Sequence, residues 1–236
     1  MKRSTTRLDR FISQNSGFSM GEVRLLIAQR KILLDGIPAH CIRQPVTRFT
    51  RVVLDGIVLR DAQPVYLALH KPAGVVSATK DGKHPTVLDL VRHPRKNELH
   101  LAGRLDFNTT GLVLLTNDGA WSRRLSAPET KLPKVYEVSV ARPLSEEYVA
   151  AFRAGIYFAY EGMTTLPAQL EIRSARTCRL SLVEGKYHQV KRMFGHFGNK
   201  VLSLHRVSIG PVRLGELQAG TTRPLTRSEL AQVAQR

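Results

Sequence analysis

The sequence predicts an α+β fold, in which a small N-terminal α/β domain precedes a larger domain built on a mixed, largely antiparallel sheet flanked by helices. With 236 residues, the chain can form one substantial core and one small accessory domain. Segments with the alternation of strands outnumber helical segments, and two Asp-Gly dipeptides mark hairpins. A polar linker with Pro64, at residues 61–65, separates a domain at residues 1–60 from one at residues 66–236.

The N-terminal domain is expected to contain two short helices and two hairpins. One apolar helix face is formed by Leu8, Phe11 and Ile12. Ser19 and Glu22 have capping-box spacing, which predicts a helix start ahead of three apolar positions, Val23, Leu26 and Ile27. Two apolar strands then run into tight turns, at Asp35-Gly36 and Asp55-Gly56.

The larger domain is expected to combine short strands with short helices. Strands are predicted at residues 65–69, 112–115, 136–140 and 179–183. A helix is predicted to begin after Pro85, because Thr86 and Asp89 have capping spacing. A second helix places four apolar residues on one face, Val190, Met193, Phe194 and Phe197.

Positive charge dominates the composition. The chain has 36 Lys and Arg against 19 Asp and Glu, a net charge of +17, and both predicted domains share the excess. Such a field favours polyanions, so nucleic acid is the expected partner. No stretch approaches the roughly 20 apolar residues of a membrane span, and the basic first residues lack the apolar core of a secretory signal, which predicts a cytoplasmic protein. Cys41 and Cys178 lie far apart without metal-type spacing, so no metal site is expected.

The stretch AGRLDFNTTGLVLLTNDG, from Ala102 to Gly119, contains the leading catalytic candidate. Asp106 precedes a turn and a buried apolar strand, and a loop residue at a strand end is rigid yet accessible. Arg104 can pair with this carboxylate or with a phosphate, and an ionised carboxylate can act as a nucleophile or a base. A structural salt bridge in a turn has the same spacing, so the spacing alone does not decide.

Three other basic clusters add to this pattern. HKPAGVVSA places Lys71 in a rigid loop that could meet a phosphate. LPKVYEVSV places Tyr136 in a strand near Lys134, and EGKYHQVKRMFGHFG places His188, Lys191 and Arg192 on the polar side of a helix. Taken singly, each fits an ordinary surface or core role.

Together, in this order, the motifs resemble those of bacterial ribosomal RNA pseudouridine synthases. AGRLDFNTTGLVLLTNDG is similar to the signature of that family, and HKPAGVVSA, the strand with Tyr136, EGKYHQVKRMFG and VLSLHRVSIGPVRLGELQAGTTRPLT resemble its other segments. The resemblance covers residues 65 to about 228. It implies an enzyme that isomerises uridine in RNA without a metal or an organic cofactor.

The resemblance also implies roles for particular residues. Asp106 is the essential aspartate, attacking either the ribose or the base, and Tyr136 stacks on the flipped uracil and assists proton transfer at C5. Lys191 is the basic partner of the aspartate. Arg104 holds the flipped nucleotide through a backbone or phosphate contact, or is itself the partner of Asp106, and Leu204 lines the pocket.

The N-terminal segment resembles the small RNA-binding domain named after ribosomal protein S-four. Its pattern begins like RLDRFISQ and ends like KILLDG. The sequence departs from that pattern at Met20, where arginine is common, at Arg30, where glycine is usual, and at Asp35, where asparagine is usual. The expected RNA contacts of the whole chain are Arg7, Arg24, Arg30, Lys31, Lys71 and Arg192.

Within the family, the two longest motifs resemble the enzymes that act on small-subunit (16S) ribosomal RNA. The expected substrate is one uridine in that RNA or in a partly assembled small subunit, modified by a monomeric enzyme. Two alternatives remain: the same chemistry on large-subunit (23S) RNA, and an assembly factor that binds ribosomal RNA without turnover.

Overall fold

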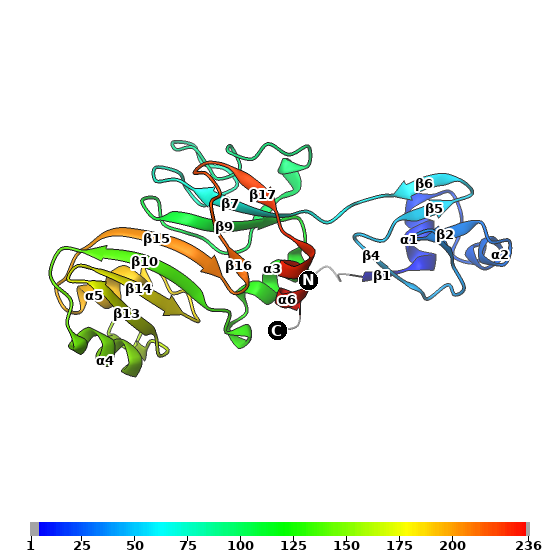
Figure 1. The fold of residues 1–236 in the computed structure, drawn as a ribbon. Coiled ribbons are helices and arrows are strands. Elements are labelled where there is room, and N and C mark those ends of the chain that lie inside the picture. Colours follow the sequence, from blue (N-terminus) through cyan, green and yellow to red (C-terminus); the bar gives the residue numbers. More distant parts are fainter. Residues whose placement is uncertain (1–4, 235–236) are drawn as a thin grey trace. The chain divides into compact units, whose positions relative to one another are not determined.

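The structure is a computed structural model that describes residues 5–234, and its chain divides between Pro64 and Val65 into two compact units (Figure 1). Residues 61–65 have no regular secondary structure. Each unit has its own hydrophobic core. No helix of the described residues is long and apolar enough to cross a membrane.

The N-terminal unit packs two short helices against short strands. Its elements are β1 Thr5–Arg7, α1 Leu8–Asn15, α2 Val23–Ala28, β2 Ile32–Leu34, β3 Ile37–Pro38, β4 Pro45–Thr47, β5 Val52–Leu54 and β6 Ile57–Arg60. The capping box ahead of α2 is confirmed, because the Ser19 amide donates to the Glu22 carboxylate at 2.7 Å and the Glu22 amide donates to the Ser19 hydroxyl at 3.4 Å. Both Asp-Gly turns are confirmed as the hairpin turns β2–β3 and β5–β6.

The larger unit is built on one nine-stranded sheet with the path β13-β14-β10-β15-β9-β7-β17, to which β8 and β16 add at the sides. Its strands are β7 Tyr66–Lys71, β8 His100–Leu101, β9 Thr110–Thr116, β10 Lys134–Val140, β13 Gln169–Ser174, β14 Thr177–Leu182, β15 Val201–Ile209, β16 Val212–Arg213 and β17 Thr222–Pro224. A separate hairpin pairs β11 Tyr157–Phe158 with β12 Met163–Thr164. The β9–β15 pair is parallel and the other named pairs of the sheet are antiparallel, which confirms the predicted mixed, largely antiparallel sheet.

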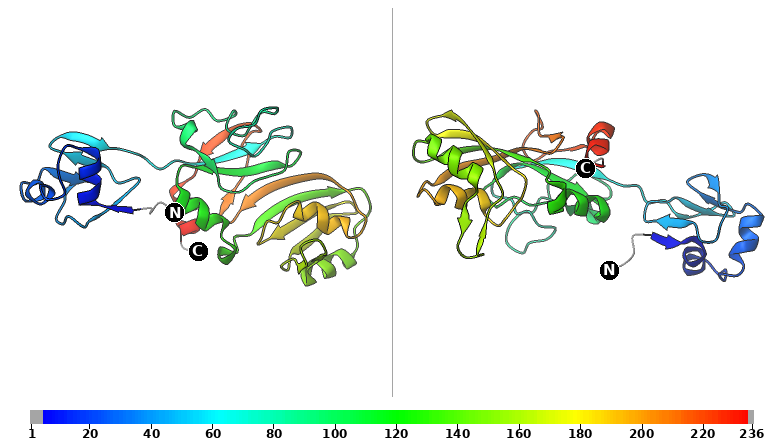
Figure 2. Two further views of the ribbon diagram at one scale, coloured as in Figure 1. Left: turned by 180° about the vertical axis from the view of Figure 1, so that it is seen from behind. Right: turned by 90° about the horizontal axis from the view of Figure 1, so that it is seen from below.

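Different elements cover the two faces of this sheet (Figure 2). The helical elements of the unit are η1 Lys96–Glu98, α3 Gly119–Ser126, η2 Pro128–Thr130, α4 Glu146–Ala154, α5 Gln189–Gly195 and α6 Arg227–Ala234. One core joins α4, α5 and part of residues 72–105 to one face, and a second core joins α3 and α6 to the other. The side chains of β9 alternate between the two cores. Val113 and Leu115 pack in the first core, and Leu112 and Leu114 pack in the second.

The predicted helix after Pro85 is wrong. Thr86 and Asp89 do form the reciprocal capping contacts, at 2.7 and 3.3 Å, but only turns and the short 3-10 helix η1 follow them before β8. Pro94 lies a few residues downstream and disfavours helical backbone at His93, the residue before it. Thr86 instead forms a bridge with Val76.

Candidate active site

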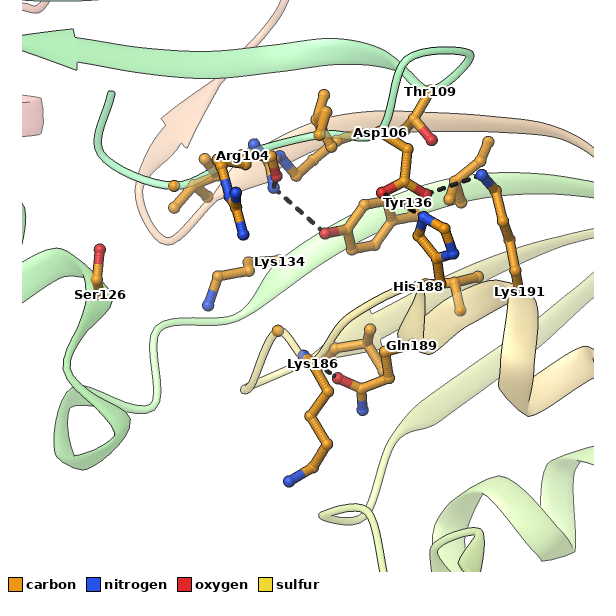
Figure 3. A pocket seen from close by; sticks show the side chains of 18 of the residues that line it. Arg104, Asp106, Thr109, Ser126, Lys134, Tyr136, Lys186, His188, Gln189 and Lys191 are labelled. Carbon is orange, nitrogen blue, oxygen red and sulfur yellow. Dashed lines mark hydrogen bonds and ion pairs between the residues drawn. The ribbon is translucent and has the colours of Figure 1, made fainter. Parts of the chain in front are cut away.

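A pocket of about 200 Å³ opens on the sheet where β10 and β15 lie side by side (Figure 3). Its walls come from the loop at residues 102–106 and from the start of α5, and its floor comes from β10 and β15. Asp106 is the one acidic residue among the described residues that line it. The basic lining residues are Arg104, Lys134, Lys186, Lys191 and Arg206. An excess of positive charge around a single carboxylate suits a polyanionic substrate.

Asp106 lies between β8 and β9 with its side chain 29% exposed. The Lys191 ammonium donates to its Oδ2 atom at 2.8 Å, and His188 Nε2 lies 3.5 Å from its Oδ1 atom. Both partners come from the start of α5, where His188 adopts a left-handed backbone with φ of 49°. Arg104, the alternative partner, forms no ion pair with Asp106 among the described residues. The structure therefore brings Asp106 and Lys191 together from distant parts of the chain.

Lys71 is buried beneath the Asp106 loop. Its ammonium donates to the carbonyl oxygens of Pro72 at 2.9 Å, Phe107 at 3.0 Å and Thr109 at 2.8 Å. Burial lowers the pKa of Lys71 to about 8, against the opposing charge of Asp106. The prediction that Lys71 contacts RNA is wrong, since all three donors of a fully buried ammonium bind backbone.

The rest of the HKPAGVVSA segment supports the same loop. The Gly74 amide donates to the Phe107 carbonyl at 3.1 Å. The Ser77 hydroxyl donates to the Leu105 carbonyl at 2.7 Å and accepts the Leu105 amide at 3.0 Å. The segment thus fixes the backbone on both sides of Asp106, which places the carboxylate rigidly at the pocket.

Tyr136 and Leu204 lie on neighbouring strands of the pocket floor, 7% and 8% exposed. Leu204 pairs with Val138 in the β10–β15 register, and Tyr136 pairs with Arg206. Tyr136, predicted as a catalytic residue, and Leu204, predicted as a pocket residue, therefore line the same pocket as Asp106.

Arg206 is the site residue that the sequence analysis missed. It is 3% exposed, and its Nε atom donates to the Leu112 carbonyl at 2.8 Å. Its Nη1 atom lies 3.3 Å from both the Arg104 carbonyl and the Tyr136 hydroxyl. One guanidinium thus connects β15, β9, β10 and the loop at residues 102–106. A basic residue two positions after Leu204, in phase with the buried side of a strand, was the signal available in the sequence.

Gly111 permits the close contact of β9 with β15. It pairs with Arg206 in the parallel register and has a φ of +108°. A Cβ atom at this position would lie 2.3 Å from the Arg206 carbonyl oxygen and 2.6 Å from its amide nitrogen. The glycine of the TTG motif is therefore required by backbone packing as well as by conformation.

Lys134 and Lys186 add charge at the pocket wall. Burial lowers the pKa of Lys134, and the charge of Arg206 acts in the same direction while Glu184 opposes it. The Lys186 ammonium lies 3.4 Å from the Glu184 carboxylate. Arg104 is exposed and also lines the pocket.

Arg192, for which an RNA contact is predicted, does not line this pocket. Its guanidinium binds the Glu161 carboxylate, with an Nη1–Oε1 distance of 2.6 Å, and lies 3.7 Å from the centroid of the Phe158 ring. The pair is partly exposed, with the Arg192 side chain 27% accessible, and surface ion pairs are weak, so the RNA contact of Arg192 stays a prediction.

The predicted RNA-binding residues of the N-terminal unit differ in availability. Arg24 and Arg30 are exposed, and Arg30 has a left-handed φ of 55°, which explains why glycine is usual there. Lys31 pairs with Asp55 at 3.2 Å on the surface, and Arg7 binds the Asp9 carboxylate. Arg24 and Arg30 are therefore the most accessible of the four cations.

The chain is similar to known proteins in both sequence and structure. Residues 65–196 match the RNA pseudouridylate synthase family. A ribosomal small subunit pseudouridine synthase A from Pseudomonas aeruginosa is 49% identical over 229 residues, which cover 96% of this chain and 100% of that protein. The protein of that name from Escherichia coli is 40% identical, with 96% and 99% of the two chains covered. A crystal structure of a pseudouridylate synthase superposes with a TM-score of 0.70 at 39% identity, covering 96% and 99% of the chains.

Proposed function

The chain belongs to the RNA pseudouridylate synthase family, and from this premise we propose that it isomerises one uridine of small-subunit (16S) ribosomal RNA to pseudouridine, with Asp106 as the nucleophile. The observation that carries the proposal is the Asp106 carboxylate, bound by Lys191 at 2.8 Å inside a basic pocket. The RNA target comes from the relatives that share nearly the whole chain and are named for the small ribosomal subunit.

The reaction needs no net redox change and no second substrate. The bond from ribose C1′ to uracil N1 breaks, the uracil turns, and C1′ bonds to C5. The proton lost from C5 is balanced by the proton that N1 gains. Asp106 attacks either the ribose or the base, and both routes require a carboxylate that is held beside a uridine turned out of its stack.

The other pocket residues then have defined tasks. Lys191 holds the carboxylate at one oxygen and leaves the other to face the nucleotide and His188. Tyr136 and Leu204 supply the apolar surface for the uracil, with Tyr136 stacking on the base and assisting proton transfer at C5. Arg206 fixes the phenol and the loop, and Arg104 binds the nucleotide backbone.

We further propose that residues 1–60 form a ribosomal protein S-four-like domain that strengthens RNA binding through phosphate contacts at Arg24 and Arg30. The enzyme acts as a monomer in the cytoplasm, on free RNA or on a partly assembled small subunit. Residues 1–60 hold 11 Lys and Arg against four Asp and Glu, which supports a mainly electrostatic contribution from this domain.

The test compares purified small-subunit and large-subunit RNAs, each incubated with the enzyme and mapped by primer extension after carbodiimide treatment. One new stop in small-subunit RNA is expected. A stop confined to large-subunit RNA would overturn the target, and no stop in either RNA or in small-subunit particles would favour the non-catalytic alternative. Asp106→Asn and Asp106→Ala both remove the carboxylate, and each is expected to abolish the stop while RNA affinity changes little. An active Asp106→Ala enzyme would exclude this residue as the nucleophile.

A further inference from the structure

An exposed aromatic ring follows the catalytic carboxylate directly in the chain. Phe107 is 39% exposed, and its ring lies against that of His84, with centroids 4.9 Å apart and an interplanar angle of 55°. Neither ring lines the pocket that holds Asp106. Because adjacent Cα atoms are about 3.8 Å apart, the pair stands beside the pocket and outside it.

Both rings are carried by well-fixed backbone. The Phe107 carbonyl accepts hydrogen bonds from the Lys71 ammonium at 3.0 Å and the Gly74 amide at 3.1 Å. The His84 amide donates to the Asp81 carboxylate at 2.8 Å. The loop at residues 77–85 is closed at its base, where the Val76 amide donates to the Pro85 carbonyl at 3.0 Å. Such a surface needs little ordering when it binds a ligand, which favours affinity.

The charge around the pair points to RNA. Lys80 and Lys83 are exposed on the same loop as His84. The one carboxylate of that loop, on Asp81, is exposed, and it accepts hydrogen bonds from the Lys83 and His84 amides, both at 2.8 Å. An exposed ring flanked by cations is the arrangement that stacks an unpaired base while its phosphates meet the positive charge.

We propose that Phe107 and His84 form a stacking platform for an unpaired nucleobase next to the target uridine. The inference rests on the proposed function, since it assumes that a uridine leaves its stack to reach Asp106. A neighbouring base then loses a stacking partner, and the Phe107 ring can stack on that base in its place, next to Asp106. Stacking accepts any base, so the platform selects a single-stranded segment without selecting its sequence.

The test measures single-turnover pseudouridine formation by the full chain on unmodified small-subunit RNA. Stacking on an aromatic residue is worth about 1–3 kcal/mol, so Phe107→Leu is expected to raise the half-saturating concentration about 5- to 150-fold. The maximal rate constant should stay nearly unchanged. Phe107→Trp keeps an aromatic ring and should therefore retain wild-type affinity. Tyr160→Leu is the matched control, because Tyr160 is 97% exposed and belongs to another segment, the β11–β12 hairpin, and it should behave as wild type.

Tryptophan fluorescence gives a second measurement that does not depend on turnover. The chain has one tryptophan, Trp121, which is 3% exposed and supplies the baseline. RNA should quench the added fluorescence of Phe107→Trp, because the new indole stacks on a base, and should leave the wild-type signal nearly constant. His84→Ala in the same protein should reduce the quenching.

Defined results would overturn the platform. They are an unchanged half-saturating concentration for Phe107→Leu, a loss confined to the maximal rate constant, or no quenching of Phe107→Trp by an RNA that binds. If the wild type makes no pseudouridine, the proposed function fails. The fluorescence result then decides the platform by itself.

Discussion

The substitution Gly111→Ala tests whether the close contact of β9 with β15 holds the site together. The added Cβ would lie 2.3 Å from the Arg206 carbonyl oxygen, which belongs to backbone and cannot rotate away. The residue would also keep a φ of +108°, which side chains disfavour. The two strands must then separate, and Arg206 moves with β15 away from Leu112 and from the Arg104 carbonyl.

Two costs set the expected magnitude. Holding a non-glycine residue at this φ costs about 1–3 kcal/mol, and forcing an atom into a packed contact costs about 1–3 kcal/mol more. The free energy of unfolding should therefore fall by about 2–6 kcal/mol, a large share of the 5–15 kcal/mol typical of a folded protein. Gly103→Ala provides the matched control, because Gly103 has a φ of +99° but nothing within 4 Å of the added atom. It should show the conformational cost alone.

Urea unfolding followed by circular dichroism measures both variants, and pseudouridine formation is measured below the temperature at which Gly111→Ala unfolds. We expect Gly111→Ala to be the less stable variant and to lose activity on the order of 10²-fold while folded, since small displacements of catalytic groups have effects of that size. Equal destabilisation by the two substitutions would refute the reasoning, because the contact with Arg206 would then contribute nothing.

Three further predictions concern other cations. Lys191→Met should lower the single-turnover rate constant on the order of 10²-fold with little change in RNA affinity, because it releases the Asp106 carboxylate; a filter-binding assay beside the turnover assay checks both. The pKa of Lys71 is about 8 in the folded protein and 10.5 ordinarily, so between these pH values the unfolded chain binds the extra proton. The free energy of unfolding of the wild type, relative to Lys71→Met, should therefore rise from pH 8 to pH 10.5 in urea titrations, and a constant difference would contradict the shift. Affinity for RNA falls as salt rises, and neutralising Arg24, Arg30 and Lys31 together should make the slope of log affinity against log salt less steep by about two. An unchanged slope would refute phosphate contacts.

Local structure was largely predictable from the sequence, because its signals are local. The Asp35-Gly36 turn and the Ser19 capping box depend on a few neighbouring residues and appear as expected. The same kind of signal at Thr86 gave a capped turn without a helix, since the capping pair concerns one turn and not the backbone that follows it.

The site was less predictable, because burial and distant contacts decide it. Lys71 follows a strand in a Pro-Gly loop, a pattern equally suited to a phosphate contact and to a buried support, and only packing distinguishes them. The contact of Lys191 with Asp106 joins residues 85 positions apart, and the family resemblance implied it where spacing could not. Arg206 was missed because a charged residue in a strand was not expected to be buried in the pocket floor.

The position of β15 in the sheet affects how the chain folds while the ribosome synthesises it. This strand lies between β10 and β9 and joins the two halves of the sheet, yet it begins at Val201, long after β9 has ended at Thr116 and β10 at Val140. A growing chain therefore holds two half-sheets that have no common strand until residues 201–209 leave the exit tunnel, and contacts of such long sequence separation form late. A polypeptide interrupted before Val201 already contains Asp106, Tyr136 and Lys191, but it lacks the strand that unites the halves of their pocket.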